Sequence, residues 1–362
     1  MIQKPALCFS VSPACNPRQL ALSLFLSTSF ASFAAGGGAA AYLKKDASWY
    51  LSEEGQRITT NILSFQSDLG GWPKNTDTVD KPYKGKREDL HPTFDNSATT
   101  DELRFLARSY NATHEESRKQ ALIKGFGYIL KAQYPTGGWP QYYPPSKQYH
   151  RYITFNDNSM VRLLEFLREV SRSEEYAFLP IADRKAAGAA FDQGIACILK
   201  CQIRVDGKPT VWCAQHDEID YSPQKGRAYE LASFSGSESV GITRLLMSLE
   251  NPSPEIRASI EGAVSWFESA KITGIRLDKN PKSPLENSKD LIVVSDPSAP
   301  PLWARFYDLK TQKPFFCDRD SIPKATLAEI GSGRRNGYSW YGQWPASLLE
   351  KDYPAWKTKH TR

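Results

Sequence analysis

The sequence carries little net charge, and this shortage excludes a strongly basic class of protein. Its 362 residues include 46 basic and 40 acidic side chains, which gives a formal charge of +6. So mild an excess favours acidic partners without demanding nucleic acid. We therefore expect a globular chain, of one large domain or two of ordinary size, that takes an anionic partner and binds no nucleic acid.

Cysteine is also scarce, with six in the chain, two of them at Cys8 and Cys15. Three others lie ahead of His216 with nearly the spacing of a structural zinc site: Cys197, Cys201 and Cys213. Thiols one helical turn apart on an apolar face are more often buried core, and we favour core packing over zinc. A single disulfide among the cysteines beyond residue 41 stays open.

Charge is absent altogether between Arg18 and Tyr42. An apolar run there is followed by small residues, the order of a secretory signal with a cleavage site near Ala34 to Ala41. The run is too short and too rich in serine to span a membrane. We expect residues 1–41 to be a secretory signal and small-residue stretch, 42–362 to be a single catalytic domain, and the protein to be secreted or periplasmic.

A repeat is what the sequence does contain. "ILSFQSDLGGWP" begins at Ile62, "ILKAQYPTGGWP" at Ile129 and "ILKCQIRVDGKPTVW" at Ile198. Each copy ends a helix-like apolar run and enters a loop rich in glycine and proline. The chain therefore repeats a helix followed by a long loop three times.

A second helix follows each loop. Segments starting at Thr93, Thr154 and Ser233 place Ser, Thr, Asn or Asp ahead of apolar residues at i, i+3 and i+4. No hairpin of this kind can bury its apolar face alone, so the hairpins should pack side by side. The pattern predicts an all-α fold, an α/α toroid or incomplete barrel whose long loops form a cleft.

From about Ile272 to Pro301 the helical pattern fails among five prolines and scattered charges. We expect a long loop over the cleft there. The segment "GSGRRNGYSWYGQWP" then returns to the style of the first loops and should complete the same face.

Aromatic side chains on the glycine-rich loops suit stacking against sugar rings. The candidates are Trp72, Trp139, Tyr142, Trp340 and Tyr341. The alternative, that each tryptophan fills the core of its own hairpin, is equally open for Trp72 and Trp139 because tryptophan is mostly buried.

Acidic and amide residues begin the second helices. Asp95 with Asn96, and Asp157 with Asn158, stand at matching points of two repeats. Two carboxylates with amide oxygens would suit Ca²⁺ with part of its shell left for a substrate. Simple N-capping of the helices remains the alternative.

The third repeat has basic residues in place of the acidic pair. Lys225 and Arg227 enter its helix together with Glu230, and Arg305 and Arg319 lie downstream. Guanidinium groups beside a cation site would form a receptor for carboxylates. Taken singly, each arginine is more often a solvated or paired surface residue.

These motifs together resemble the catalytic module of family ten pectate lyases. The resemblance rests on "GGWPKN", "TFDNSATTDELRFLA", "GGWPQYYP", "TFNDNSM", "VWCAQHDE", "GRAYELASFSGSES", "LWARFYDL" and "GYSWYGQWP", between about residues 50 and 357. It implies an α/α toroid and calcium-assisted anti β-elimination of polygalacturonate. We expect the protein to be a monomer.

The resemblance also implies roles for single residues. Asp95 and Asp157 would face the substrate through calcium, with Asn96 nearby, and Arg227 would take the proton from C5 of the uronate. Arg305 and Arg319 would grip uronate carboxylates. The remaining candidates for substrate binding are Lys225, Trp340 and Tyr341.

An arginine base is chemically awkward because its side chain normally stays protonated. A neighbouring cation would lower its pKa, and we expect that effect here. Three other classes remain as alternatives: a triterpene cyclase with its glutamine and tryptophan repeats, a non-catalytic uronate-binding protein, and an inverting glycosidase using Asp95 and Asp157 as acid and base.

Overall fold

A computed structural model of the chain describes residues 38–279 and 290–360. The predicted secretory segment lies outside these residues except for its last four positions, and so do Cys8 and Cys15. Those four positions belong to a 3-10 helix, Gly38–Tyr42, in which Ala39 is buried. Packing of the described domain therefore starts a few residues before the boundary predicted at residue 42.

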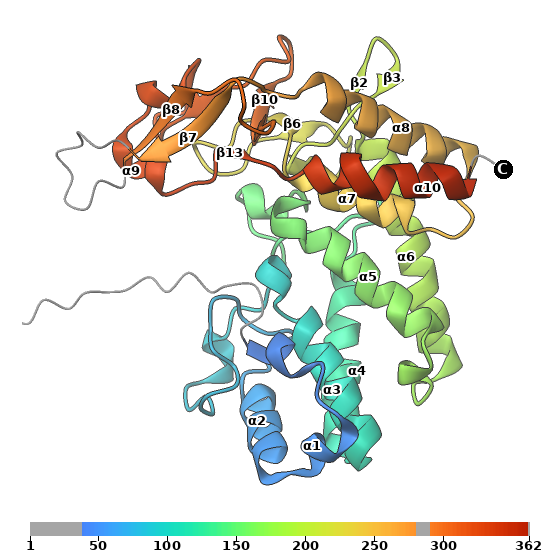
Figure 1. The fold of residues 1–362 in the computed structure, drawn as a ribbon. Coiled ribbons are helices and arrows are strands. Elements are labelled where there is room, and N and C mark those ends of the chain that lie inside the picture. The colour runs from blue at the N-terminus through green and yellow to red at the C-terminus, as the bar shows by residue number, and fades with distance from the viewer. Residues whose placement is uncertain (1–37, 280–289, 361–362) are drawn as a thin grey trace, which may run out of the picture. The chain divides into compact units, whose positions relative to one another are not determined.

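Helices joined by long loops form most of the described domain (Figure 1). Each of α3, α5 and α7 contacts the helix that follows it, and α5 also contacts both α3 and α7. This is a helical fold with only short strands. The helices are α1 (Ala47–Leu51), α2 (Glu53–Ser64), α3 (Thr100–Thr113), α4 (Glu116–Ala132), α5 (Ser159–Arg172), α6 (Ile181–Cys201), α7 (Glu238–Met247), α8 (Pro254–Ser269), α9 (Ser332–Asn336) and α10 (Tyr353–His360).

Each repeat found in the sequence carries the same tryptophan hydrogen bond in the structure. In each unit a buried tryptophan of the loop donates its ring N–H to a carbonyl near the end of the preceding helix, which fixes how the chain leaves that helix. The bonds join Trp72 to Ile62 (2.7 Å), Trp139 to Ile129 (2.9 Å), Trp212 to Ile198 (2.7 Å) and Trp303 to Phe267 (2.8 Å). The core interpretation of Trp72 and Trp139 is therefore the right one, and a fourth unit that the sequence did not show follows α8.

Glutamines link each unit to the next. The side-chain amide of the glutamine after one α-helix donates to a carbonyl of its own loop. It also donates to a carbonyl of the second α-helix further along the chain. The links between units run from Gln66 to Ala121 in α4 (2.8 Å), from Gln133 to Ala190 in α6 (2.9 Å) and from Gln202 to Ser259 in α8 (2.9 Å). These bonds tie α2, α4, α6 and α8 into one series.

The segment from Ile272 to Pro301 is not a plain loop, so that expectation is wrong. Strands β7 (Ile275–Lys279) and β8 (Leu291–Ser295) pair antiparallel over five residues on either side of 280–289. Leu277, Ile292 and Val294 alternate with polar or exposed positions, the period of a half-buried strand. The prolines lie outside the paired residues and masked this signal in the sequence.

Eleven further strands of two or three residues lie in the loops of the described domain. They pair as β1 (Ile153–Thr154), β4 (Gln215–His216) and β5 (Pro223–Gln224); β2 (Arg204–Val205) with β3 (Lys208–Pro209); β6 (Ser233–Ser235) with β10 (Phe306–Asp308); β9 (Trp303–Ala304) with β13 (Tyr341–Gly342); and β11 (Phe316–Cys317) with β12 (Pro323–Lys324). All are antiparallel.

The cysteines and His216 form core and not a zinc site. Cys213 donates its backbone N–H to Nε2 of His216 at 3.0 Å, while Nδ1 lies 2.7 Å from the Tyr221 carbonyl, so both ring nitrogens are occupied. Burial lowers the pKa of His216 to about 4. Cys197, Cys201, Cys213 and Cys317 are free thiols, and the described residues contain no group of three or more His, Cys, Asp or Glu side chains placed to hold a metal ion.

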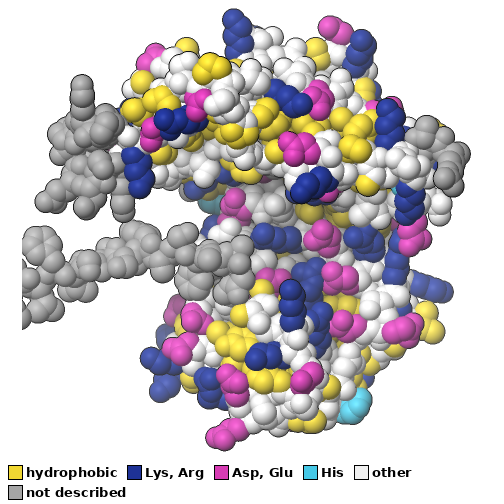
Figure 2. All heavy atoms as spheres, in the orientation of Figure 1, with side chains coloured by type: hydrophobic (Ala, Val, Ile, Leu, Met, Phe, Trp, Pro, Cys, Tyr) yellow, Lys and Arg dark blue, Asp and Glu magenta, His cyan; other side chains and the backbone are white. Residues whose placement is uncertain are grey.

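Basic and acidic side chains are interspersed over the face shown in Figure 2. That mixture agrees with the small net charge of the sequence. No helix in the described part of the chain is both long and apolar enough to cross a bilayer.

Candidate active site

Two tight turns carry the predicted metal ligands and lead into α3 and α5. They are the 3-10 turns η3 (Asp95–Ser97) and η5 (Asn156–Asn158), which contact each other. The backbone φ is +52° at Asn96 and +51° at Asp157, so these two residues occupy the same turn position. The match of Asp95 with Asp157 read from the sequence is therefore shifted by one residue, because the left-handed conformation, which Asn and Asp adopt readily, sets the register.

Neither aspartate caps the helix that follows it. The N-cap residue of α3 is Thr99, which forms a capping box with Glu102. The N-cap residue of α5 is Asn158, which makes no side-chain capping bond. The N-capping alternative is thus wrong for Asp95 and Asp157.

Asp95 is buried and fully engaged. Its Oδ2 forms a close ion pair with Lys74 and accepts a 2.7 Å hydrogen bond from Gln141, and its side chain is 3% exposed. Lys74 and Gln141 directly follow the two "GGWP" motifs, so the same position of two repeats delivers both donors. Burial opposes the charge on Lys74, but Asp95 raises the pKa of that amine above its usual range.

Asp157 is more open than Asp95. Its side chain is 42% exposed, accepts a 2.7 Å hydrogen bond from Asn156 and lies 3.6 Å from Nη2 of Arg305. Burial and the nearby carboxylate of Glu238 raise its pKa, with Asp95 adding to the effect and Arg305 opposing it. Burial and the neighbouring acids therefore outweigh the attraction of Arg305.

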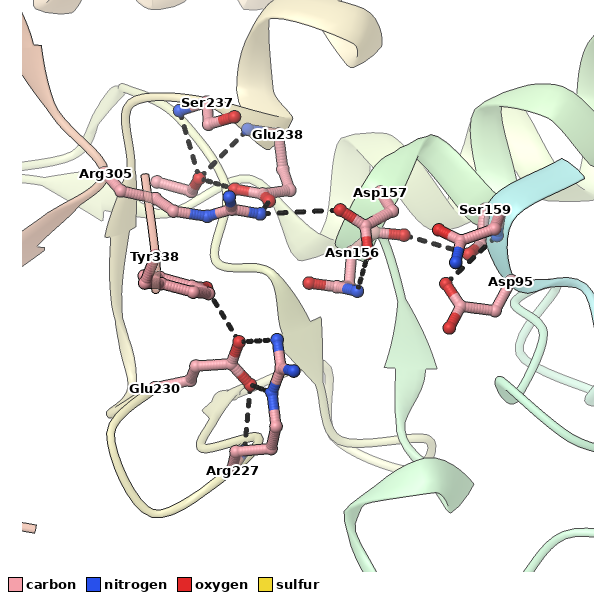
Figure 3. Close-up of polar contacts among 12 residues, drawn as sticks. Asp95, Asn156, Asp157, Ser159, Arg227, Glu230, Ser237, Glu238, Arg305 and Tyr338 are labelled. Carbon is pink, nitrogen blue, oxygen red and sulfur yellow. Dashed lines mark hydrogen bonds and ion pairs between the residues drawn. The ribbon is translucent and has the colours of Figure 1, made fainter. Parts of the chain in front are cut away.

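Arg305 lies between two acids. Its guanidinium forms a close ion pair with Glu238 in addition to the longer contact with Asp157, and its side chain is 11% exposed. Burial works against the charge, but Glu238 raises the pKa of Arg305, so this group stays protonated. Figure 3 shows Arg305 on one side of Asp157 and Asp95 on the other.

Arg227 is held by Glu230. The carboxylate accepts the backbone N–H of Arg227 at 3.0 Å and Nε at 2.9 Å, and it pairs closely with Nη2. Burial would lower the pKa of Arg227, but the hydrogen bonds and charge of Glu230 raise it overall. The expected lowering by a neighbouring cation is therefore wrong, because the dominant partner is an acid.

The other predicted residues divide between surface and core. Arg319 and Lys225 are exposed, and the loop that holds Arg319 bonds to the Arg227 loop through Ser321 and the Ala228 carbonyl at 2.9 Å. Asn96 is exposed and donates to Asn75 at 3.1 Å. These side chains are accessible, but only Asn96 directly adjoins the aspartates.

Trp340 is a core residue in this structure. It is 2% exposed, its ring N–H donates to the Arg334 carbonyl at 3.1 Å, and its ring packs on Phe306 and Phe316. Its faces are not accessible to a sugar, contrary to the stacking expected from the sequence. Tyr341 is partly buried against Phe316, and burial raises its pKa to about 12.

Sequence reasoning missed several partners of the site: Lys74, Gln141, Glu238 and Tyr338, together with the role of Glu230. The recurrence of a polar residue after "GGWP" could have found the first two. Tyr338 donates to Glu230 at 2.7 Å across 108 residues, and nothing in the local sequence marks such a pair.

The donor set fits a hard cation. Asp95 and Asp157 offer carboxylate oxygens from neighbouring turns, and the side chain of Asp157 is exposed enough to meet a ligand. Amide oxygens of Asn96 and Asn156 lie on the same two turns. The described residues hold two carboxylates there and not a complete cage, so a bound cation would complete its shell with water or substrate.

Comparison with known proteins agrees with the site. A family model described as pectic acid lyase matches residues 66–349. A solved structure of a family 10 polysaccharide lyase mutant from Cellvibrio cellulosa, in complex with trigalacturonic acid, is 34% identical with a TM-score of 0.74, covering 87% of this chain and 96% of that one. The lyase without the mutation gives the same identity and TM-score over 88% and 96%. No curated protein sequence matches this chain.

Proposed function

Because the chain belongs to the pectic acid lyase family and is a polysaccharide lyase of family ten, we propose that it cleaves polygalacturonate by anti β-elimination. The observation that carries the proposal is the pairing of an acidic cluster, Asp95 and Asp157, with the arginines Arg227 and Arg305 in one site (Figure 3). The relative bound to trigalacturonic acid supports a uronate polymer as substrate.

The reaction needs a base for the proton on C5 of a uronate, α to the carboxylate. A neutral guanidine of Arg227 takes this proton, the C5–H electron pair forms the C4–C5 double bond, and the glycosidic oxygen leaves C4 and takes up a proton. Glu230 raises the pKa of Arg227, so the neutral form is scarce at neutral pH and the rate rises into the alkaline range.

Negative charge builds on the uronate carboxylate as the proton leaves. Arg305 and Arg319 bind substrate carboxylates, with Lys225, Asn96 and Tyr341 at the margins of the site. Asp95 and Asp157 would hold Ca²⁺, which neutralises the substrate carboxylate when bound. Lys74 and Gln141 keep Asp95 fixed, whereas the more exposed Asp157 has one hydrogen bond, from Asn156, and a longer contact with Arg305.

The fold that presents this site is an incomplete α/α toroid. The tryptophan and glutamine bonds that repeat along α2, α4, α6 and α8 support this assignment. The uncharged stretch before Tyr42 supports export through a secretory signal. We assign catalysis to residues 42–362 acting as a monomer.

Growth of ultraviolet absorbance on polygalacturonate, with and without a chelator, tests substrate, reaction and metal together. We expect an unsaturated product, formed without consumption of water, and loss of activity after chelation. Saturated reducing ends would indicate a glycosidase, and binding without products would indicate a non-catalytic protein. Equal turnover of neutral glycans would overturn the substrate assignment.

A further inference from the structure

Glu230 is a buried carboxylate whose two oxygens both accept hydrogen bonds. Its side chain is 4% exposed. Oε2 accepts the backbone N–H and Nε of Arg227, and Oε1 accepts Nη2 of Arg227 and the hydroxyl of Tyr338. A carboxylate with four donors on two oxygens can hold the guanidinium plane in one orientation.

This arrangement leaves one nitrogen of Arg227 for chemistry. Within the described residues Nη1 has no hydrogen-bond partner, whereas Nε and Nη2 are both committed to Glu230. The Arg227 side chain is 44% exposed, so the uncommitted edge can meet a ligand. Pairing through Nε and Nη2 thus decides which atom faces the substrate.

Tyr338 connects this pair to the second arginine of the site. Its ring centre lies 4.9 Å from the guanidinium carbon of Arg305 and 5.7 Å from that of Arg227. The ring also stacks on Phe306 at 6.1 Å and packs against Trp340 at 5.1 Å. Tyr338 therefore packs on buried aromatic rings and lies beside both guanidinium groups. Figure 3 shows its hydroxyl bonded to Glu230.

We propose that Glu230 and Tyr338 are positioning residues that aim Nη1 of Arg227 at the C5 proton and fix its spacing from Arg305. This inference rests on the proposed function, because it assigns Arg227 as the base. The same carboxylate that orients Arg227 also favours its protonated form, so less of the neutral form is available as a base.

Several elements contribute charged or titratable groups around the Arg227–Glu230 pair. Groups whose charges interact with Arg227 or Glu230 lie on the turn before β1, on η5, on their own loop, on the segment between β9 and β10, and after α9. They are Tyr149, Asp157, Tyr229, Arg305 and Tyr338.

Tyr338→Phe tests the proposal because it removes one hydroxyl and keeps the ring over both arginines. We expect kcat to fall about 5- to 20-fold with KM within twofold, since orientation matters only when the proton moves. Tyr50→Phe is the matched control: it removes a buried hydroxyl that donates to Tyr42 O at 2.9 Å, far from the site, and should leave kcat unchanged.

Glu230→Gln separates orientation from charge. We expect a lower maximal rate, by about 10²-fold, and a rate–pH curve displaced to lower pH because Arg227 loses the anion that favours its protonated form. A second readout needs no turnover. The ¹⁵N–¹H signal of Arg227 Nε, assigned by its loss in Arg227→Lys, should exchange faster with water in Tyr338→Phe and Glu230→Gln than in the wild type.

Unchanged kcat together with an unchanged Nε signal in Tyr338→Phe would overturn the proposal, and so would an unshifted rate–pH curve in Glu230→Gln. A purely structural role would lower thermal stability without moving either readout. If the wild type forms no unsaturated product, the proposed function fails instead, and the two failures are distinct.

Discussion

The acidic and basic halves of the site are built in different ways. The acidic half, Asp95 and Asp157, depends on two short turns whose left-handed residues are local features of the chain. The basic half, Arg227 and Arg305, depends on buried acids and on Tyr338, which is 108 residues away from its partner Glu230. The turns leave Asp157 partly exposed, whereas each arginine is already paired with a buried acid: Arg227 with its near neighbour Glu230, and Arg305 with Glu238 from 67 residues away.

We propose separate tasks for the two halves: cation binding for the acidic half, and charge and proton handling for the basic half. The largest effect should come from Arg227→Ala. We expect kcat to fall by about 10²- to 10⁴-fold, the usual contribution of a general base, with KM nearly unchanged. Arg227→Lys should recover little, because one ammonium cannot reproduce the fork held by Glu230.

Steady-state kinetics across a calcium titration checks this division. Excess calcium that restores Arg227→Ala would join the two halves and contradict the assignment of the base. Arg227→Ala should also lower stability in urea unfolding, because it strands the Glu230 carboxylate, which is 4% exposed, with Tyr338 as its remaining side-chain donor.

Within the acidic half, Lys74→Met should have the next largest effect, on stability. It strands the Asp95 carboxylate, which is 3% exposed, with Gln141 as its remaining side-chain donor. We expect a loss of about 2–3 kcal/mol in urea unfolding, less than for a fully buried pair because Lys74 is 27% exposed. The double variant with Asp95→Asn should recover part of that loss, and full additivity of the two changes would show that the pair is not coupled.

Asp157→Ala should act on the cation requirement. Removing one hard oxygen ligand should raise the calcium concentration for half-maximal activity about 10- to 100-fold, with maximal kcat approached at saturation. Asp192→Ala, on the exposed side of α6, is the matched control and should keep the native requirement. An unaltered calcium dependence in Asp157→Ala would remove this residue from the metal site.

The smallest effect concerns pH and distinguishes the two aspartates. Burial and Glu238 raise the folded pKa of Asp157, so its protonated form stabilises the fold; that stability is present below about pH 3.8 and is lost as pH rises through the folded pKa. Asp157→Asn cannot ionise, and in metal-free protein it should melt on the order of 1–2 °C above the wild type at pH 8 and equal to it at pH 3.

Asp95→Asn should do the reverse at pH 8, because it removes the partner of Lys74. Thermal unfolding of both variants between pH 3 and 8 compares them directly. Stabilisation by both substitutions at pH 8 would show that the two carboxylates repel each other more than Lys74 attracts one of them.

The sequence predicted the features that depend on local contacts and missed those that depend on distant ones. The three helix-and-loop units were visible because each carries its isoleucine, glycine and tryptophan within a few residues. The fourth was hidden because the β7–β8 hairpin separates Phe267 from Trp303, and the bond between them crosses 36 residues.

The same limit applies to the site. Asp95, Asp157, Arg227 and Arg305 were identified from their motifs, whereas the one-residue shift between η3 and η5 needed backbone angles. Burial of Trp340 depends on Phe306 and Phe316 from other strands, so a glycine-rich aromatic segment looked exposed when it is core. The raised pKa of Arg227 required knowing that Glu230 is buried beside it.

The glutamine links give the assembly of the domain a direction. Each one reaches forward, from the end of one helix to a carbonyl at least 55 residues later in the chain. A nascent chain supplies its N-terminal units first, so α2 with Gln66 is ready as a template before α4 has been made. Growth then proceeds unit upon unit, and the arginine half of the site, which belongs to the last units, is completed only after the aspartate half has been laid down.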